Sequence, residues 1–211
     1  MKIPNLNRSL VRFWLWIHNF SVRLIHRYAI RLEGGLHPKH RIMNYHQFFI
    51  DHIFEGDTVL DIGCGNGALT RDVAQKAKNV IGIDISRQNI NIAETEYNTP
   101  NIEYIFGDAT TYNFKQKFDV IIISNVLEHI DKRVEFLQSI KELAPKLLIR
   151  VPAINRDWIT YYKKELKVEW RLDSTHFTEY TADSLVNEFE KVGLSLTETN
   201  IKFGEFWVVA E

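Results

Sequence analysis

Cysteine, long apolar runs and repeats are scarce or absent in this chain of 211 residues, and each absence excludes a class of protein. A single cysteine cannot form an internal disulfide, and it provides no Cys-x-x-Cys pair for a zinc site. We therefore predict a reducing compartment, the cytoplasm. No apolar run reaches the about 20 residues that cross a bilayer, so we expect no membrane-spanning helix. Repeats and low-complexity tracts, which would indicate a solenoid or a disordered chain, are absent.

The chain has enough apolar residues for one substantial core, and its charge is divided unevenly. A hydrophobic content of 45% over 211 residues suits a single domain. Residues 1–50 hold eight lysines and arginines against one glutamate, whereas residues 51–211 hold eighteen against twenty-six acidic residues. The net charge of −1 therefore hides balances of +7 and −8. We predict a basic extension over residues 1–50 and a separate folded domain over residues 51–211.

The most informative segment is residues 58–70, which read TVLDIGCGNGALT. An apolar strand is followed by Gly63, Gly65 and Gly67, and then by the start of a helix. Glycines allow positive φ and close approach of a ligand to the backbone, and a helix N-terminus attracts negative groups. The pattern predicts a turn that cradles a nucleotide, although a tight turn in any α/β protein is the alternative. Cys64 lies inside this turn, and we interpret it as a small packing residue because no histidine or aspartate is adjacent to activate it.

A carboxylate follows about twenty residues after the glycine turn. The apolar run of residues 80–83 ends in Asp84, where α/β nucleotide sites place an acid that accepts both ribose hydroxyls. The alternative is that Asp84 caps the helix that begins near Ser86. We favour the ribose role because the turn and the acid occur in one βαβ unit.

These motifs, with Asp61 two residues before the first glycine, resemble those of the class I S-adenosylmethionine (SAM)-dependent methyltransferases. The resemblance is close over residues 56–152 and looser to the end of the chain. After the strand at residues 102–106, Asp108 stands where the family hydrogen-bonds the adenine amino group, and residues 118–130 resemble the family's small-molecule branch. The resemblance implies SAM as the cofactor and a SAM-dependent methyltransferase domain over residues 51–211. The expected cofactor-binding residues are Asp61, Gly63, Cys64, Gly65, Asn66, Gly67, Asp84, Ile85, Asp108, Ala109, Ser124 and Asn125.

Strand and helix patterns alternate downstream, and the strands are continuous apolar runs, which suits a parallel sheet covered on both faces. We expect strands near residues 58–62, 79–84, 102–106, 118–123 and 146–151. The resemblance implies a Rossmann-like α/β fold of seven mostly parallel strands flanked by helices, in which a hairpin over residues 195–210 supplies an antiparallel strand. In this family a helix such as the one expected at residues 42–52 closes over the cofactor.

Methyl transfer is an in-line displacement, and a hydroxyl acceptor also needs a base that takes its proton. Three candidates lie in loops that leave the carboxyl ends of the fourth and fifth strands: Glu128, His129 and His176. His129 titrates near neutrality, although it could also cap or pack the next helix. His176 precedes a segment that resembles the family's "FT…L…G" pattern, and it is our first choice for the base that faces the substrate.

The three candidates also resemble part of a metal-ligand set. Small-RNA 2′-O-methyltransferases carry Glu-x-x-Glu-His after the fourth strand and a later histidine, which together hold magnesium. Here Glu128, His129 and His176 match in kind, but Asn125 stands in place of the first glutamate. One carboxylate fewer weakens a site for a hard cation, so we predict no resident metal and keep the metal as an alternative.

The resemblance implies a cytoplasmic SAM-dependent methyltransferase that acts at oxygen on a small-molecule, sugar or lipid-linked acceptor. An RNA 2′-O-methyltransferase and a non-catalytic SAM-binding partner subunit are the alternatives. Residues 155–171 are expected to shape the acceptor pocket, where Arg156, Lys163, Lys164 and Arg171 would suit a phosphate or a carboxylate. A solvated amphipathic helix is the alternative for the lysines.

The basic extension contains an amphipathic pattern over residues 8–28, which predicts one helix or two short ones. Apolar residues recur on one side, at Leu10, Phe13, Trp14, Ile17, Phe20, Leu24 and Tyr28, and the other side carries Arg8, Arg12, Asn19, Arg23 and Arg27. Three interpretations stay open. Residues 1–30 could pack on the core as a lid or a dimer surface, lie on an anionic membrane, or bind nucleic acid. Nucleic acid is the least favoured, because no RNA-binding signature accompanies the arginines.

Overall fold

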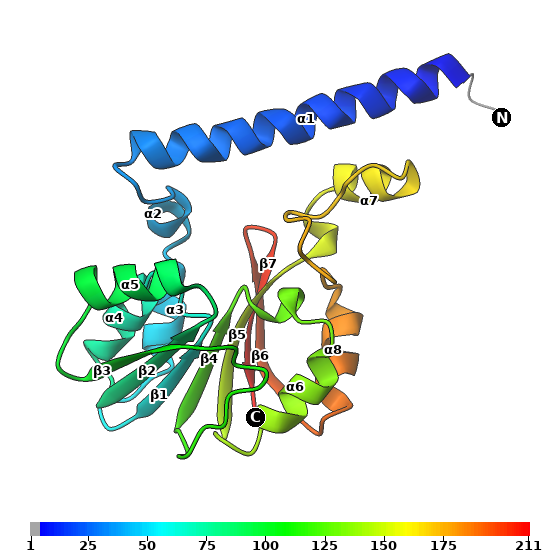
Figure 1. Cartoon of the computed structure of the whole chain (residues 1–211). Helices are drawn as coiled ribbons and strands as arrows, with labels where there is room; N and C mark the ends of the chain where they lie inside the picture. The colour runs from blue at the N-terminus through cyan, green and yellow to red at the C-terminus, as the bar shows by residue number, and fades with distance from the viewer. Residues whose placement is uncertain (1–4) are drawn as a thin grey trace.

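The computed structural model describes residues 5–211, and its centre is one seven-stranded sheet flanked by helices (Figure 1). The strand order is β3-β2-β1-β4-β5-β7-β6, with β7 antiparallel to both of its neighbours. The strands are β1 (Thr58–Ile62), β2 (Asn79–Asp84), β3 (Ile102–Phe106), β4 (Val120–Ser124), β5 (Lys146–Pro152), β6 (Leu196–Lys202) and β7 (Glu205–Ala210). The predicted Rossmann-like fold and its antiparallel C-terminal hairpin are confirmed.

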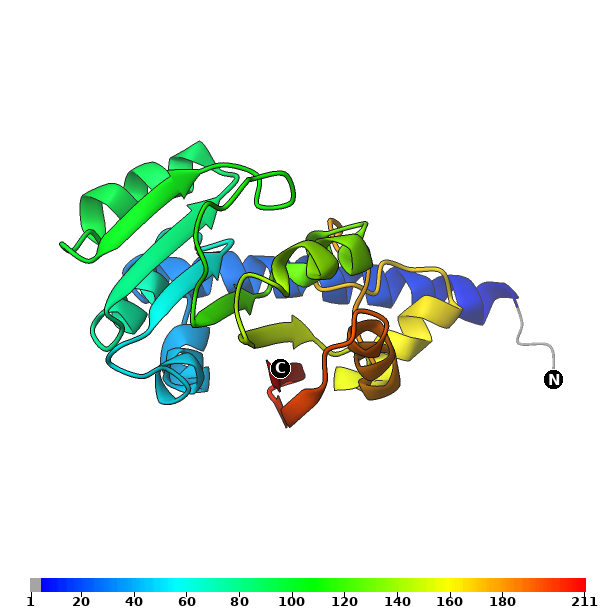
Figure 2. The same cartoon turned by 90° about the horizontal axis from the view of Figure 1, so that it is seen from below.

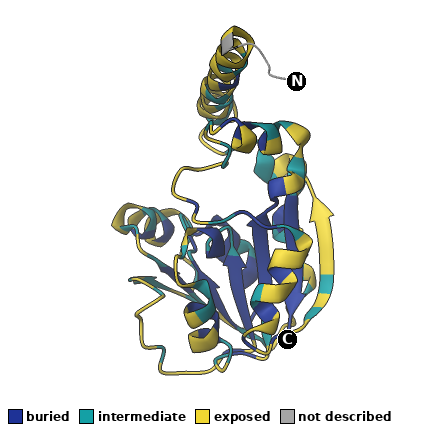
Figure 3. Cartoon of the chain, turned by 90° about the vertical axis from the view of Figure 1, so that its right-hand side faces the viewer, coloured by how far each residue is buried: buried dark blue, intermediate teal, exposed yellow. Residues whose placement is uncertain are grey.

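The sheet is buried on both faces, because successive residues of its central strands belong to two different apolar clusters. Ile121 and Ile123 of β4 join one cluster with Phe136 and Phe189, whereas Ile122 joins the other. The helices are α2 (Lys39–Met43), α3 (Tyr45–Asp51), α4 (Ala68–Ala74), α5 (Arg87–Glu96), α6 (Arg133–Ile140), α7 (Trp158–Glu165) and α8 (Ala182–Glu190), with short 3₁₀ turns η1 (Leu127–His129) and η2 (Ile154–Arg156). Each fully buried isoleucine stabilises the fold by about 1.5 to 3 kcal/mol relative to an exposed one. Figure 3 shows the resulting contrast between the buried sheet and the exposed edge strand β6.

Residues before position 51 also build the core. Tyr45, Phe48 and Phe49 of α3 are buried in the cluster that covers one face of the sheet. The domain boundary at residue 51 stays a prediction. α3 packs on the sheet, so it belongs to the same folded unit as the sheet and its flanking helices, which we call the body.

The basic extension forms one unbroken helix, α1 (Asn5–Leu32), of 28 residues. It ends before Gly34 and Gly35, whose φ values of 72° and 106° are in the left-handed region that glycine tolerates. α1 crosses the molecule on the side where the parallel strands end (Figure 1), and Figure 2 shows it running along the body behind the sheet. Among the helices of the described chain, none is both long and apolar enough to cross a bilayer.

The face of α1 that meets the body is not the aromatic one. The Arg12 guanidinium donates to the carbonyl of Leu166 (2.8 Å), and the Asn19 amide donates to that of Glu169 (2.7 Å). Between them lies Leu15, which is 8% exposed and is the buried apolar residue of the helix. The side that the pattern assigned to polar residues therefore supplies the contacts, because carbonyl groups of the loop after α7 need hydrogen-bond donors.

Candidate active site

A cavity of about 880 Å³ opens at the carboxyl ends of β1 to β4, where open α/β sheets bind their ligands. Six residues of the expected cofactor set line it: Gly63, Asp84, Ile85, Asp108, Ala109 and Asn125. The cavity continues to Val126, His129 and Lys132, which follow β4. One cavity therefore joins the side expected for the cofactor to the side expected for the acceptor.

The three glycines of the turn differ in what surrounds them. A Cβ on Gly63 would lie 2.3 Å from Cγ2 of Val126, and one on Gly67 would lie 2.5 Å from the Tyr104 hydroxyl. A Cβ on Gly65 would meet nothing within 4 Å, although its φ of 56° is also positive. Two glycines are thus required by packing, whereas Gly65 borders open space that a ligand can enter.

The Asp84 carboxylate is held at the cavity by backbone groups. Its Oδ2 accepts from the N–H of Gly65 (2.9 Å), and its Oδ1 accepts from the N–H of Ser86 (2.8 Å). The residue that caps α5 is Ser86, whose side chain accepts from the N–H of Asn89 (3.3 Å). Since each carboxylate oxygen has two lone pairs, Asp84 can still accept hydrogen bonds from a ligand.

Asp108 follows β3, whose last residue, Phe106, pairs with Asp84 in the sheet. One oxygen of its carboxylate accepts from the N–H (2.9 Å) and the hydroxyl (2.7 Å) of Thr110. Ile85 stands close by with 70% of its surface exposed, which is unusual for an isoleucine. Two oriented carboxylates and an exposed apolar side chain are what a nucleoside needs for its polar groups and its base.

Six residues of the expected cofactor set are not among those that line the cavity: Asp61, Cys64, Gly65, Asn66, Gly67 and Ser124. Asp61 is 1% exposed and accepts from the Thr70 hydroxyl (2.7 Å), and burial raises its pKa to about 7. Burial likewise raises the pKa of the Cys64 thiol, which keeps it protonated and unreactive at neutral pH. The interpretation of Cys64 as a packing residue agrees with this position.

Asn125 begins the acceptor side with a strained backbone. Its φ is 54°, in a region uncommon for residues other than glycine, and its N–H donates to the carbonyl of Arg150 (2.7 Å). Such strain occurs most often next to ligands. The turn at Asn125 is followed by η1, whose last residue, His129, lines the cavity.

His129 is exposed at the cavity, and its neighbours define its tautomer. The Thr175 hydroxyl donates to Oδ1 of Asp173 (2.8 Å), so its oxygen accepts from Nδ1–H of His129 (2.9 Å). Partial burial and the nearby His176 lower the pKa of His129, so the ring is neutral at pH 7. A neutral ring that donates through Nδ1 has Nε2 free to accept a proton.

His176, the first choice from the sequence, lies behind His129. It is 6% exposed, and its Nδ1 lies 3.0 Å from Oε1 of Glu179. Its ring meets that of His129 edge to face, with centroids 4.6 Å apart. The structure therefore brings both histidines together but gives only His129 a place on the cavity wall.

Glu128 completes a three-residue cluster. It is 1% exposed, burial raises its pKa to about 8, and its Oε2 atom has no hydrogen-bond partner among residues 5–211. Glu128, His129 and His176 each offer one ligand atom within 4.8 Å of the others. The carboxylate of Glu179 orients His176 as such groups orient metal-binding histidines, so the cluster has the donors for a divalent ion.

The two arginines expected at the acceptor, Arg156 and Arg171, are engaged within the protein. Arg156 pairs with Glu179 and donates to the carbonyl of Trp170 (2.7 Å). Arg171 pairs with Glu169 (2.8 Å) and donates to the carbonyl of His176. These arginines fix the loop that carries His176, and they do not line the cavity.

Arg150 was not among the residues expected at the site. It lies in β5, two positions before the strand ends, and is 2% exposed. Its guanidinium lies 3.6 Å from the centre of the Tyr45 ring and 3.3 Å from Oε2 of Glu205, beside the turn at Asn125. The available signal was one arginine inside the apolar run of residues 147–151. A charge in such a run is buried and therefore needs partners.

The family model described as a methyltransferase domain matches residues 35–199. A ubiquinone biosynthesis O-methyltransferase from Nitrobacter winogradskyi is 30% identical over 165 residues, covering 72% of this chain and 63% of that protein. An (S)-coclaurine N-methyltransferase from Thalictrum flavum is 33% identical over 135 residues, covering 61% of this chain and 36% of that protein. The matches thus span less than two thirds of either relative.

The solved DhpI–SAH complex is similar in structure, with a TM-score of 0.66, 16% identity, and coverage of 90% of this chain and 93% of that one. At this identity the similarity concerns the fold. The family match concerns the sequence itself, and it extends from before α2 into β6, so it includes all the residues that line the cavity. The chain therefore belongs to the class I SAM-dependent methyltransferases, and SAM is its cofactor.

Proposed function

We propose that this enzyme transfers the methyl group of SAM to a hydroxyl oxygen of a small-molecule, sugar or lipid-linked acceptor in the cytoplasm. The observation that carries the proposal is the place of His129 on the cavity wall, with its Nδ1 engaged by Thr175. A hydroxyl must lose its proton during methylation, whereas a neutral amine can react through its lone pair. A relative named as an O-methyltransferase supports the same atom.

The cofactor residues fit SAM in kind. We infer that Asp84 accepts hydrogen bonds from the ribose hydroxyls, that Asp108 accepts one from the adenine amino group, and that Ile85 packs on the base. The open space beside Gly65 suits the approach of the methionine part to the backbone. SAM supplies an activated methyl group on a positively charged sulfur, and the chain's own contribution is to hold it in line with the acceptor oxygen.

His129 would act as the base in this scheme. It takes the proton of the acceptor hydroxyl on Nε2, and the resulting positive ring is stabilised through Thr175 by the carboxylate of Asp173. The pKa of Asp173 is lowered, mainly by the hydrogen bonds of Thr175, so the carboxylate is charged at neutral pH. His176 and Glu179 hold the ring of His129 from behind.

The test incubates the full chain and SAM labelled in its methyl group with cell fractions, taken separately: lipid, polysaccharide, small-molecule and RNA fractions. We expect label in one of the first three fractions, and its loss in His129→Gln. Label confined to RNA would support the RNA 2′-O-methyltransferase instead. Binding of SAM without label in any fraction would support a non-catalytic partner subunit.

A metal-dependent reaction is the second candidate, because Glu128, His129 and His176 form a three-ligand cluster. One carboxylate and two histidines suit a borderline divalent ion better than magnesium, which prefers oxygen ligands. The metal would bind the acceptor oxygen and lower its pKa, which removes the need for a separate base. Dialysis against a chelator separates the two: retained activity supports His129 as the base, and loss that is restored by Mn²⁺ or Zn²⁺ supports the metal.

A further inference from the structure

α1 exposes large apolar side chains to solvent along most of its length. Trp14 is 63% exposed, Trp16 54% and Phe13 51%. The further exposed apolar residues of the helix are Leu6, Leu10, Phe20, Ile25, Tyr28 and Leu32. Extended apolar patches of this kind on a folded protein mark a surface that binds something.

These side chains are concentrated on the side of α1 that points away from the body. We define the aromatic face of α1 as Leu10, Phe13, Trp14, Phe20 and Tyr28. At about 100° per residue, Leu10, Phe13, Phe20 and Tyr28 lie about 140° to 160° from Leu15, the residue that packs against the body, and Trp14 lies at the edge of the face, about 100° from it. Figure 3 shows that most of α1 is exposed. The aromatic contacts of this face among residues 5–211 are with other residues of α1, namely with one another, Trp16 and Arg31.

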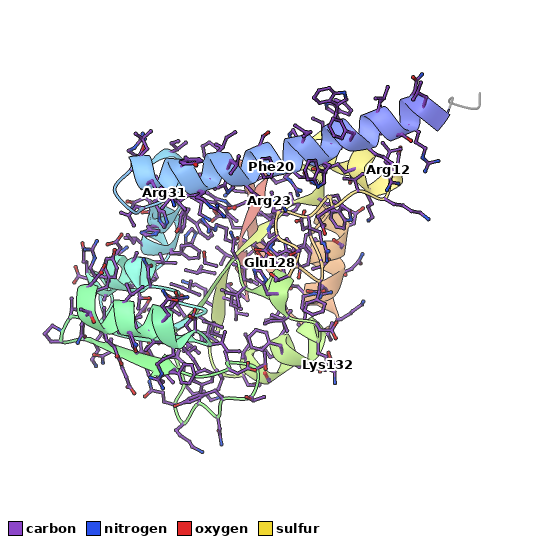
Figure 4. The ribbon with its side chains drawn as sticks, turned by 45° about the horizontal axis from the view of Figure 1, so that its top comes forward. Arg12, Phe20, Arg23, Arg31, Glu128 and Lys132 are labelled. Carbon is purple, nitrogen blue, oxygen red and sulfur yellow. The ribbon has the colours of Figure 1, made fainter. Side chains whose placement is uncertain are left out.

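The charge of α1 has one sign. The helix contains Arg8, Arg12, Arg23, Arg27 and Arg31 and no aspartate or glutamate. Figure 4 labels three of these arginines, which are spread from one end of the helix to the other. On the helical wheel, Arg23 and Arg27 lie beside the edge of the aromatic face that holds Phe20, and Arg31 lies in line with Phe13 and stacks on the ring of Tyr28.

We propose that α1 binds the surface of an anionic lipid bilayer, with the aromatic face in the headgroup region and the flanking arginines on lipid phosphates. An amphipathic helix with aromatic residues on one face and arginines beside it is the form that interfacial helices take. A second copy of α1 is a poorer partner, because two helices without acidic residues would oppose arginine to arginine. Nucleic acid would attract the arginines but would leave most of the aromatic face in water.

The position of α1 gives the binding a consequence for the acceptor. α1 crosses the molecule on the side where the parallel strands end, which is also the side of the cavity (Figure 1). Figure 4 shows Glu128 in the body below α1. A bilayer bound to α1 therefore lies on the acceptor side of the enzyme, which suits a lipid-linked acceptor; this last step rests on the proposed function.

Vesicle sedimentation of the full chain tests the binding separately from any methyl transfer. The probes are vesicles of phosphatidylglycerol with phosphatidylcholine in equal parts and vesicles of phosphatidylcholine alone. We expect binding to the first, weakened at least about 30-fold by Arg23→Glu with Arg27→Glu, because each arginine near such a surface contributes about fivefold and the new carboxylates are repelled. The matched control reverses two exposed lysines of the body, Lys78→Glu with Lys115→Glu, and should bind within about threefold of the original chain.

A second pair of variants tests the aromatic face. Phe13→Ser with Phe20→Ser should lower vesicle binding at least tenfold, whereas Phe54→Ser with Phe203→Ser, also exposed, should leave it unchanged. Calorimetric SAM binding confirms that each variant is folded. Equal binding to both kinds of vesicle, or no binding, would overturn the proposal. If the full chain does not bind vesicles, RNA binding would overturn the proposal. So would formation of a dimer that is lost in the α1 variants alone.

Discussion

The cofactor half and the acceptor half of the cavity are built in different ways. The cofactor half comes from the ends of β1, β2 and β3, and backbone N–H groups hold its Asp84 carboxylate. The acceptor half joins segments about 45 residues apart, since His129 depends on Thr175 and on His176. The first half is defined by local motifs and the second by long-range contacts, so substitutions should separate cofactor binding from chemistry.

The largest effect is expected at His129. His129→Gln removes the base and should slow the chemical step about 100-fold, equivalent to about 2.7 kcal/mol, with SAM affinity unchanged. His176→Gln should have a smaller effect, because His176 touches the ring of His129 and does not line the cavity. Single-turnover rates with the labelled acceptor measure both, with the exposed His18→Gln as the control. A greater loss in His176→Gln would make His176 the base, as the sequence predicted.

Asp84 should affect the cofactor half alone. Asp84→Ala is expected to weaken SAM by about 1.5 to 3 kcal/mol, the value of hydrogen bonds to a charged group. Calorimetric titration measures the change, and Asp51→Ala, an exposed acid of α3, is the matched control. Unchanged affinity in Asp84→Ala would show that the acid serves only the backbone of Gly65 and Ser86.

Substitutions of Gly67 and Gly65 should have different effects, the first mainly on the stability of the fold and the second mainly on SAM binding. Gly67→Ala places a Cβ 2.5 Å from the Tyr104 hydroxyl at a positive φ, and should lower the free energy of unfolding by about 1 to 3 kcal/mol. Gly65→Ala meets no neighbour, so it should cost about 1 kcal/mol of stability and impair SAM binding more. Urea unfolding and SAM titration of both variants test the division. Equal losses of stability would contradict it.

The smallest expected effect is the pH dependence of the chemical step. A histidine accepts a proton only when neutral, and the pKa of His129 is lowered from 6.5. The rate should therefore be constant above pH 7 and fall only at a pH below 6.5, by up to about tenfold for each pH unit below the pKa. The acid limb should disappear in His129→Gln. A rate that rises instead through pH 8 would indicate Glu128, whose pKa is raised to about 8.

The cofactor half could be predicted almost fully from the sequence, because its residues follow apolar strands at fixed spacing. Six of the expected residues line the cavity, and Asp61, one of those that do not, is held by the Thr70 hydroxyl below the turn. The relative places of His129 and His176 could not be predicted. They depend on the hydrogen bond between His176 and Glu179, and Glu179 is not one of the residues that the "FT…L…G" pattern specifies.

The orientation of α1 on the body could not be predicted from the sequence either. An amphipathic pattern gives two faces but does not say which one meets the body. That choice depends on carbonyl groups of Leu166 and Glu169, which need donors such as Arg12 and Asn19. Arg156 and Arg171 were expected at the acceptor pocket. They contact Glu179 and the carbonyl of His176 instead, and these partners could not be identified from the sequence.

The central claim is that the methyl group goes to oxygen. The most direct measurement incubates the full chain with the responsive cell fraction and SAM that carries a deuterated methyl group, and then locates the label by tandem mass spectrometry. The proposed function predicts a deuterated methyl ether on a small-molecule, sugar or lipid-linked product, absent with His129→Gln. A deuterated methyl group on nitrogen or carbon would contradict the assignment of His129 as the base for a hydroxyl acceptor.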